Sequence, residues 1–342
     1  MKPIQTLLRN NIKNLSPYSS ARDEYSGEAM VFLDANENPF NAPYNRYPDP
    51  LQRQLKKKIA EIKNCSPGQI FLGNGSDEPI DLVFRAFCEP GIDNMVSIDP
   101  TYGMYQVAAG INNIEVRKVP LAQDFSFSAD ALLKSADAHT KLVFVCSPNN
   151  PTGNLMNKAE ILKLIRDFQG LVVLDEAYTD FSPGASLLPE LEQHPNLIIL
   201  QTFSKAWGMA GIRLGMAFAQ PEVIRTFNKI KYPYNINILT QQKALELLDQ
   251  EPEKNGWVAL LMNERARMAK ALAKFSFVTT IYPSDANFLL VKMQNARNIY
   301  HRLADNGIIV RDRSKVILCT ESLRITIGSS EENDILLNAL KD

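Results

Sequence analysis

Short, mostly apolar runs recur along the middle of the chain, and stretches with apolar residues at helical spacing separate them. Apolar runs of this kind are typical of strands that are buried on both faces of a sheet. We therefore expect a mostly parallel sheet with helices on both faces. Its strands are expected at Ile70–Leu72, Asn94–Ile98, Lys141–Cys146, Leu171–Leu174, Leu197–Thr202 and Leu214–Ala219. The helices between them are expected at Thr101–Ile111, Lys158–Phe168 and Pro221–Ile230.

The pattern changes at Lys231–Ile238, where a proline and two asparagines interrupt the periodicity. Two longer helices are expected next, at Thr240–Leu248 and at about Glu253–Phe275. Shorter elements follow, with strands at Phe277–Tyr282, Asn287–Val291, Ile308–Arg311 and Leu323–Ile327, and helices at Ala296–Asn306 and after Ser329 or Ser330. This mixture of elements predicts a second, smaller α+β domain.

The first part of the chain is rich in proline and asparagine, which favour turns and extended backbone. We expect an extended arm there. The predicted organisation is an arm over residues 1–45 that belongs with the small domain, a large domain over residues 46–237 and a small C-terminal domain over residues 238–342. Two domains agree with a length of 342 residues, since a domain usually has ~100–200 residues.

Composition excludes several classes of function. Lys and Arg total 37 against 38 Asp and Glu, so the net charge of −1 gives no basic surface for nucleic acid or for an anionic membrane. The longest apolar run, Trp257–Met262, is far shorter than the ~20 residues of a membrane-spanning helix. The first residues lack the apolar segment of a secretory signal. Four scattered cysteines without a CxxC pair indicate reduced thiols and a cytoplasmic protein.

Candidate chemistry does not involve histidine clusters. The three histidines lie far apart in the sequence and have no metal-ligand spacing, so we expect no metal site and a base other than imidazole. Four other clusters each lie at a strand end or at a turn from a strand into a helix. Because ligands of open α/β sheets bind at the carboxyl ends of the strands, these clusters are expected to meet.

The first cluster, Gly73–Glu78, is a glycine-rich turn into a helix that extends to about Cys88. Glycines let a backbone approach a ligand closely, and the free N–H groups of a helix N-terminus bind phosphate. An ordinary capping turn would have the same residue types. The second cluster, Ser147–Gly153, directly follows the strand Lys141–Cys146. Its Asn150 can donate an amide hydrogen bond to a ligand oxygen, and a purely structural turn is the alternative.

The third cluster, Asp175–Tyr178, ends an apolar strand. A carboxylate is costly to bury there unless it is paired, so Asp175 either faces a cationic ligand atom or caps a partly solvated turn. The fourth cluster, Thr202–Gly208, places Lys205 just past another strand, with Arg213 nearby along the chain. Most lysines are solvated, but a lysine at a strand end can have a lowered pKa and form a Schiff base.

Taken together, the four clusters predict one cofactor site. Pyridoxal 5′-phosphate (PLP) needs a phosphate site, an anion beside its ring nitrogen, hydrogen-bond donors for its phenolic oxygen and an amine that bonds to its aldehyde. The sequence has a candidate for each need, in the same order: the turn Gly73–Glu78, Asp175, Asn150 and Lys205. The clusters therefore favour a PLP-dependent protein.

The same segments resemble the fold-type I, class II PLP-dependent aminotransferases. The run T-F-S-K-A-W-G-x-x-G is similar to the lysine attachment motif of the class II group, and S-P-N-N-P-T-G and D-E-A-Y are similar to motifs of the wider family. Within it, the chain resembles the histidinol-phosphate aminotransferases from about Asn10 to its C-terminus. That resemblance rests on Asn14–Arg22, Leu33–Pro39, Asn45–Asp49, Arg85–Gly91, Pro100–Tyr105, Ile308–Asp312 and Leu323–Gly328. It implies an α/β fold with a large, mostly parallel seven-stranded sheet domain and a smaller α+β domain.

The resemblance also implies roles in holding the cofactor. Lys205 would attach PLP and then move the substrate's proton, and Asp175 would pair with the protonated ring nitrogen. Tyr178 and Asn150 would hydrogen-bond the phenolic oxygen, and Tyr102 would stack on the ring. The residues implied to hold the cofactor phosphate are Gly75, Ser76, Asp77, Ser204 and Arg213.

Further residues are implied to bind the substrate and the second subunit. Tyr47 would reach the cofactor phosphate of the neighbouring subunit, which implies a homodimer with a shared active site. Arg324 would bind the carboxylate of glutamate. Arg324, Arg311 and Tyr18 would bind the phosphate of histidinol phosphate, because a guanidinium fork pairs with either oxyanion. Asn36 of the arm belongs to the same implied group of substrate-binding residues.

The reaction implied by the resemblance is amino transfer between L-histidinol phosphate and 2-oxoglutarate, which gives imidazole-acetol phosphate and glutamate. An aromatic-amino-acid aminotransferase and a PLP-dependent decarboxylase of a phosphorylated amino acid are the alternatives within the family. A non-catalytic PLP-binding relative is disfavoured, because Lys205, Asp175, Arg213 and Arg324 are all present.

Overall fold

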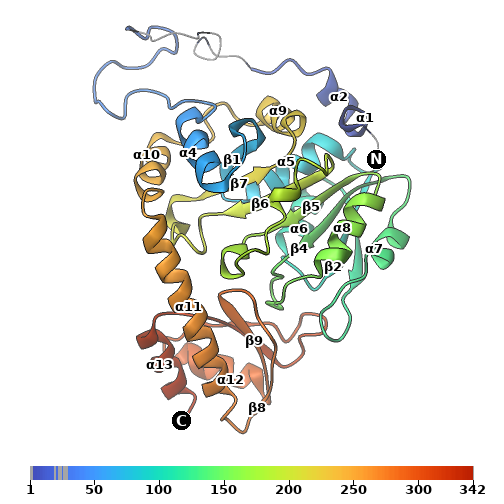
Figure 1. The fold of residues 1–342 in the computed structure, drawn as a ribbon, viewed down its shortest axis with the longest axis vertical. Coiled ribbons are helices and arrows are strands. Elements are labelled where there is room, and N and C mark those ends of the chain that lie inside the picture. Colours follow the sequence, from blue (N-terminus) through green and yellow to red (C-terminus); the bar gives the residue numbers. More distant parts are fainter. Residues whose placement is uncertain (1–2, 19–20, 22–24, 26–29, 342) are drawn as a thin grey trace.

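The computed structural model describes residues 3–18, 21, 25 and 30–341. It contains a seven-stranded sheet, in the upper part of Figure 1, and a four-stranded sheet below it. The strands of the large sheet are β1 (Ile70–Asn74), β2 (Asn94–Asp99), β3 (Glu115–Pro120), β4 (Thr140–Cys146), β5 (Leu171–Asp175), β6 (Leu197–Thr202) and β7 (Leu214–Phe218). Their spatial order is β1-β7-β6-β5-β4-β2-β3, and β7 runs opposite to the other six strands. The predicted mostly parallel seven-stranded sheet is confirmed.

Strand β3 is the one strand of the large sheet that the hydrophobic pattern did not locate. It lies at the edge of the sheet, next to β2 only. Its sequence, E-V-R-K-V-P, has no residue that is fully buried. An edge strand pairs on one side and faces solvent on the other, so it lacks the apolar run that marks the central strands.

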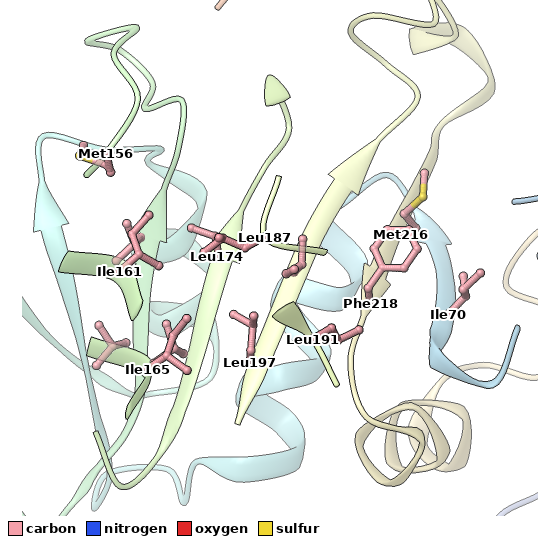
Figure 2. Packing of buried hydrophobic residues seen from close by; sticks show 14 of the residues in the cluster. Ile70, Met156, Ile161, Ile165, Leu174, Leu187, Leu191, Leu197, Met216 and Phe218 are labelled. Carbon is pink, nitrogen blue, oxygen red and sulfur yellow. The ribbon is translucent and has the colours of Figure 1, made fainter. Parts of the chain in front are cut away.

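Helices cover both faces of this sheet. On one face lie α4 (Arg53–Lys63), α7 (Ala129–Ser135), α8 (Lys158–Asp167) and α10 (Ile238–Leu247), and on the other lie α5 (Asp77–Phe87), α6 (Met104–Ile111) and α9 (Pro221–Ile230). Successive side chains of a strand point to opposite faces, so Val172 and Leu174 belong to the first core and Leu171 and Val173 to the second. Figure 2 shows part of the first core, with Ile161 and Ile165 of α8 and Leu174 of β5 among its labelled side chains. The prediction of helices on both faces is confirmed.

The smaller sheet is antiparallel throughout, with the order β10-β11-β9-β8. Its strands are β8 (Val278–Ile281), β9 (Phe288–Met293), β10 (Arg311–Asp312) and β11 (Ser322–Thr326), and its helices are α11 (Glu251–Leu272), α12 (Ala296–Asp305) and α13 (Ser330–Ala339). A capping box of Ser329 and Glu332 begins α13, and Ser329 is one of the two serines at which the sequence predicted the start of this helix. The smaller α+β unit is therefore confirmed, although its third expected strand is only two residues long.

The N-terminal arm differs from the expectation. Two short helices, α1 (Ile4–Leu7) and α2 (Asn10–Lys13), place Ile4, Leu7 and Ile12 in the core beside α5. The start of the arm therefore packs on the large sheet and not with the small domain, because its apolar residues occur at helical spacing and bury there. Residues 30–50 form a loop without helix or strand, which runs outward from the body of the molecule (Figure 1).

The boundary that we predict between residues 237 and 238 falls just before α10. This helix packs on α4, and its Ala244 belongs to the core of the large sheet. The long helix α11 follows and runs from the large sheet to the small one (Figure 1). The remaining elements are short 3-10 helices, η1 (Pro67–Gln69), η2 (Thr179–Phe181), η3 (Leu188–Glu190) and η4 (Ala210–Ile212). No helix within the described residues is long and apolar enough to cross a membrane.

Candidate active site

A cavity of about 350 Å³ lies at the carboxyl ends of β4, β5 and β6, where the small sheet approaches the large one. It brings together most of the predicted site residues, namely Gly75, Ser76, Asp77, Tyr102, Asn150, Asp175, Tyr178, Ser204, Lys205, Arg213, Arg311 and Arg324. Four further residues line it to which the sequence analysis gave no role, namely Cys146, Arg313, and Ala177 and Thr202 of the third and fourth clusters. Residues of all four clusters thus lie around one cavity, as their positions at strand ends predicted.

One end of the cavity is formed by the turn into α5. Gly75 has φ +71°, and a side chain there would meet the Arg213 guanidinium at 2.6 Å, so glycine is required for this packing. The Arg213 Nη2 lies 3.7 Å from Asp77 Oδ2. Ser76 precedes α5 without capping it through its side chain, and the first N–H groups of a helix have no acceptor within the helix. Backbone N–H groups, a guanidinium and the Ser204 hydroxyl therefore form a donor set suited to a phosphate.

Asp175 ends β5 and is almost completely buried. The Tyr105 hydroxyl donates a hydrogen bond to its Oδ2 at 2.5 Å, and the Ala177 N–H donates to its Oδ1 at 3.0 Å. Burial raises the pKa of the Asp175 carboxyl, and these hydrogen bonds oppose that shift. The carboxylate has no ion-pair partner within the described residues, so it suits a cationic ligand atom.

Tyr105 is a positioning residue that the sequence reasoning missed. It lies on α6, three positions after Tyr102, and the two rings meet edge to face with centroids 5.5 Å apart. The side chains of Tyr105 and Cys146 belong to the same core as Leu171 and Val173 of β5, which is the face to which the Asp175 side chain also points. The alternation of β5 could have indicated that a helix on this face holds the carboxylate.

Lys205 lies on the turn after β6 and lines the cavity, with its Nζ 5.6 Å from the centroid of the Tyr178 ring. Partial removal of water from the amine, together with the nearby Arg324, lowers the pKa of Lys205, and Asp175 opposes the shift. A lower pKa increases the fraction of neutral amine, which is the form that attacks a carbonyl carbon. The position of Lys205 therefore suits covalent attachment of an aldehyde.

Arg324 on β11 links the small sheet to the loop after β4. Its Nη1 donates a short hydrogen bond to Asn150 Oδ1, and Asn150 Nδ2 lies 3.5 Å from the Tyr178 hydroxyl. The guanidinium also lies 5.3 Å from the centroid of the Phe288 ring. Burial raises the pKa of Tyr178, so this phenol stays neutral and able to donate a hydrogen bond.

The end of the cavity at the small sheet is rich in positive charge. Arg311 and Arg324 face each other in the register of β10 and β11, and Arg313 follows directly. None of the three guanidiniums forms an ion pair with a carboxylate of the described chain. Because this positive charge is not neutralised by the protein, the cavity suits an anionic group at this end.

The predicted residues of the arm lie outside this cavity. Tyr18 is 71% exposed, Asn36 lies in the loop with φ +56°, and Tyr47 stacks on Tyr234 with ring centroids 4.4 Å apart. The roles of Tyr18 and Asn36 stay predictions. The role of Tyr47 at the neighbouring subunit also stays a prediction, and Tyr47 does not line the cavity of its own chain.

The donor set can be compared with the groups of PLP. One cavity is lined by hydrogen-bond donors for an oxyanion at the turn into α5, by the amine of Lys205 and by the buried carboxylate of Asp175. They correspond to the cofactor's phosphate, aldehyde and ring nitrogen. No group of His, Cys, Asp and Glu side chains within the described residues is arranged to hold a metal ion.

Comparison with known proteins identifies the family. Residues 31–340 match the family model of aminotransferase class I and II. The chain is 58% identical to the histidinol-phosphate aminotransferase of Parabacteroides distasonis, over all of this chain and 99% of that protein. It is 59% identical to the enzyme of the same name from Bacteroides fragilis, again over all of this chain and 99% of the relative.

Solved structures agree in fold. The histidinol-phosphate aminotransferase from Clostridium acetobutylicum superposes with a TM-score of 0.80 at 25% identity, covering 87% of this chain and 90% of that one. The enzyme of that name from Sinorhizobium meliloti, solved in complex with pyridoxal 5′-phosphate, gives a TM-score of 0.79 at 27% identity over 90% of this chain and 88% of that one. The chain has the fold-type I architecture and belongs to the class I and II aminotransferases.

Proposed function

We propose that this chain catalyses the reversible transfer of an amino group between L-histidinol phosphate and 2-oxoglutarate, with imidazole-acetol phosphate and glutamate as the other pair of compounds, in histidine biosynthesis. The observation that carries the proposal is one cavity that is lined by Lys205, by Asp175, by the turn into α5 and by the guanidiniums of Arg311 and Arg324. Relatives of 58% and 59% identity over the full chain have names that agree with this reaction. A cytoplasmic location belongs to the same proposal.

PLP is the cofactor that this site is proposed to bind. When bound, it supplies an aldehyde that bonds to amines and a ring that draws electrons from the reacting carbon. The N–H groups of Ser76 and Asp77, the Ser204 hydroxyl and Arg213 would hold its phosphate. Tyr102, whose hydroxyl donates to Asp77 Oδ1 at 3.2 Å, would stack on its ring.

Different side chains of the site are proposed to have different roles in the reaction. Lys205 would hold the cofactor through its neutral amine and would take the proton from the substrate carbon. Asp175, which accepts a hydrogen bond from Tyr105, would lie beside the ring nitrogen and favour its protonated form. Asn150 and Tyr178 would donate hydrogen bonds to the phenolic oxygen.

The guanidinium end recognises the far end of each substrate. Histidinol phosphate and glutamate both present an oxyanion remote from the amine, and a guanidinium fork binds either with paired hydrogen bonds. The proposal that Arg324 serves both is supported by its hydrogen bond to Asn150 and by its position opposite Arg311 in the register of β10 and β11. Two successive substrates can thus use one cavity without rearrangement of the charge at its end.

The proposal is tested by supplying histidinol phosphate and 2-oxoglutarate to the PLP-loaded protein and measuring the formation of imidazole-acetol phosphate. Phenylalanine is offered as a competing amino donor, and its own keto product is measured beside it, since both donors yield glutamate. Formation of imidazole-acetol phosphate that phenylalanine barely slows is the expected result. Preferential use of phenylalanine would support the aromatic aminotransferase in place of the proposed reaction. Release of CO₂ from a phosphorylated amino acid would support a decarboxylase.

Arg324→Ala is expected to impair both half-reactions, because the same fork binds the phosphate and the carboxylate. A lost hydrogen bond between charged groups is worth ~1.5–3 kcal/mol, or ~10–150-fold in kcat/KM. Arg311→Ala and Tyr18→Phe are expected to act mainly on histidinol phosphate. The measurement is kcat/KM of each half-reaction in single-turnover mode. If Arg311→Ala and Tyr18→Phe reduce the rate with glutamate as strongly, the phosphate-site assignment is wrong.

We also propose a homodimer in which Tyr47 crosses to the neighbouring site. Mixing Tyr47→Phe subunits with Lys205→Ala subunits then gives heterodimers with one intact site and one site that carries both lesions. Each heterodimer is expected to regain half the activity of a wild-type dimer, measured after purification by two different affinity tags. The homodimer of each variant is the control. Heterodimers no more active than the variant homodimers would place Tyr47 in its own subunit's site.

A further inference from the structure

Arg313 lines the cavity but has no place in the roles described so far. Its backbone is fixed beside β11, since its N–H donates to the Ser322 carbonyl at 2.9 Å and its own carbonyl accepts from Val316 N–H at 2.8 Å. Its side chain is half-buried, and its Nε is buried without a hydrogen-bond partner among the described residues. A buried guanidinium nitrogen without an acceptor indicates that an acceptor arrives with a ligand.

The charged groups that act most strongly on Arg313 are two other guanidiniums. Burial and the neighbouring guanidiniums of Arg324 and Arg311 lower the pKa of Arg313 to about 10. The two carboxylates that line the cavity have other partners, since Asp77 lies beside Arg213 and Asp175 accepts from Tyr105. Three like charges held together in this way repel one another until an anion binds between them.

The two proposed substrates differ in how much anion they bring. A phosphate monoester has a charge of about −1.5 to −2 at pH 7 and three free oxygens. The side-chain carboxylate of glutamate has one charge and two oxygens, which a single guanidinium fork can satisfy. A third guanidinium therefore has an acceptor in the phosphate and none in the carboxylate.

We propose that Arg313 is a specificity-determining residue that binds the substrate's phosphate group alongside Arg311 and Arg324, and that glutamate leaves it unused. This inference rests on the proposed function, whose substrate carries the phosphate. Arg313 thereby favours binding of the phosphorylated substrate, whereas Arg324 binds both substrates. It gives the phosphorylated substrate an additional interaction within the same cavity.

The test replaces Arg313 by Gln, which removes the charge, and by Lys, which keeps a charge without the fork. Arg225→Gln on the exposed side of α9 is the control for the loss of one positive charge. For Arg313→Gln we expect kcat/KM with histidinol phosphate to fall ~10–100-fold and that with glutamate to change less than ~3-fold. Arg313→Lys should lie between this variant and the wild type, and Arg225→Gln should match the wild type.

A second readout does not depend on turnover of the phosphorylated substrate. Inorganic phosphate is titrated as an inhibitor of the glutamate half-reaction, and Arg313→Gln should raise its inhibition constant ~10-fold. Equal effects on both substrates, or an unchanged inhibition constant, would overturn the inference. If Arg313→Gln does not fold, as judged by circular dichroism, Arg313→Lys decides by the same criteria. A wild-type protein that does not use histidinol phosphate would overturn the proposed function, and phosphate inhibition would still decide on Arg313.

Discussion

Replacing Lys205 by Ala is expected to abolish amino transfer and to leave PLP bound through its phosphate. Proton transfer by a positioned group alone contributes ~10²–10⁴-fold in rate, and this variant also loses the amine that attaches the cofactor. The turn of Gly75 and Ser76, with Arg213, is intact in the variant. We therefore expect a loss of at least ~10⁴-fold in kcat, measured as glutamate formation.

Borohydride treatment provides the complementary measurement on the wild-type protein. It should fix the label of the cofactor on the peptide that contains Lys205. The matched control is Lys158→Ala, since Lys158 forms an exposed ion pair with Glu190 and lies outside the cavity. That control should keep full activity and the same labelled peptide. A label on another lysine, or turnover by Lys205→Ala, would contradict the assignment.

Asp175→Asn should slow both half-reactions by ~10²–10³-fold, the typical cost of removing a preorganised group that stabilises charge in a dry site. The amide has nearly the same size as the carboxylate, so the packing against Tyr105 is preserved. What is lost is the negative charge that keeps the ring nitrogen of PLP protonated. The measurement is the single-turnover rate with glutamate and with histidinol phosphate, because both reactions depend on the same nitrogen.

The control for this prediction is Asp180→Asn. Asp180 is a partly buried carboxylate that pairs with Lys254 Nζ at 3.4 Å, outside the cavity. Its replacement should leave both half-reactions close to the wild-type rate. An Asp175→Asn variant with wild-type turnover would show that Asp175 only holds the turn after β5, through its hydrogen bond from Ala177.

Hydrophobic patterning located the central strands because they are buried on both faces. β4 and β5 carry apolar residues at nearly every position, and their predicted limits differ from the structure by one residue at one end. The pattern did not locate the edge strand β3, because none of its residues is fully buried and it therefore has no apolar run. The arm was expected to belong with the small domain, but its start packs on the large sheet, because apolar residues show that a segment is buried and not which surface it packs against.

The site could be predicted where its residues lie in turns directly after strands. Lys205 and Asp175 occupy such positions, and the parallel sheet brings them together without further information. Tyr105 and Arg313 were missed because their roles come from tertiary packing. Tyr105 reaches Asp175 from a helix 70 positions away in sequence, and Arg313 reaches the cavity because β10 pairs with β11.

The central claim is that the guanidinium end of the cavity selects a phosphorylated amine. The most direct test compares histidinol phosphate with histidinol in the single-turnover half-reaction, because the two amines differ only in the phosphate. Loss of charge-assisted hydrogen bonds worth ~1.5–3 kcal/mol each predicts that kcat/KM for histidinol is lower by at least ~10²-fold. Similar values for the two amines, or a higher value for phenylalanine than for histidinol phosphate, would contradict the account.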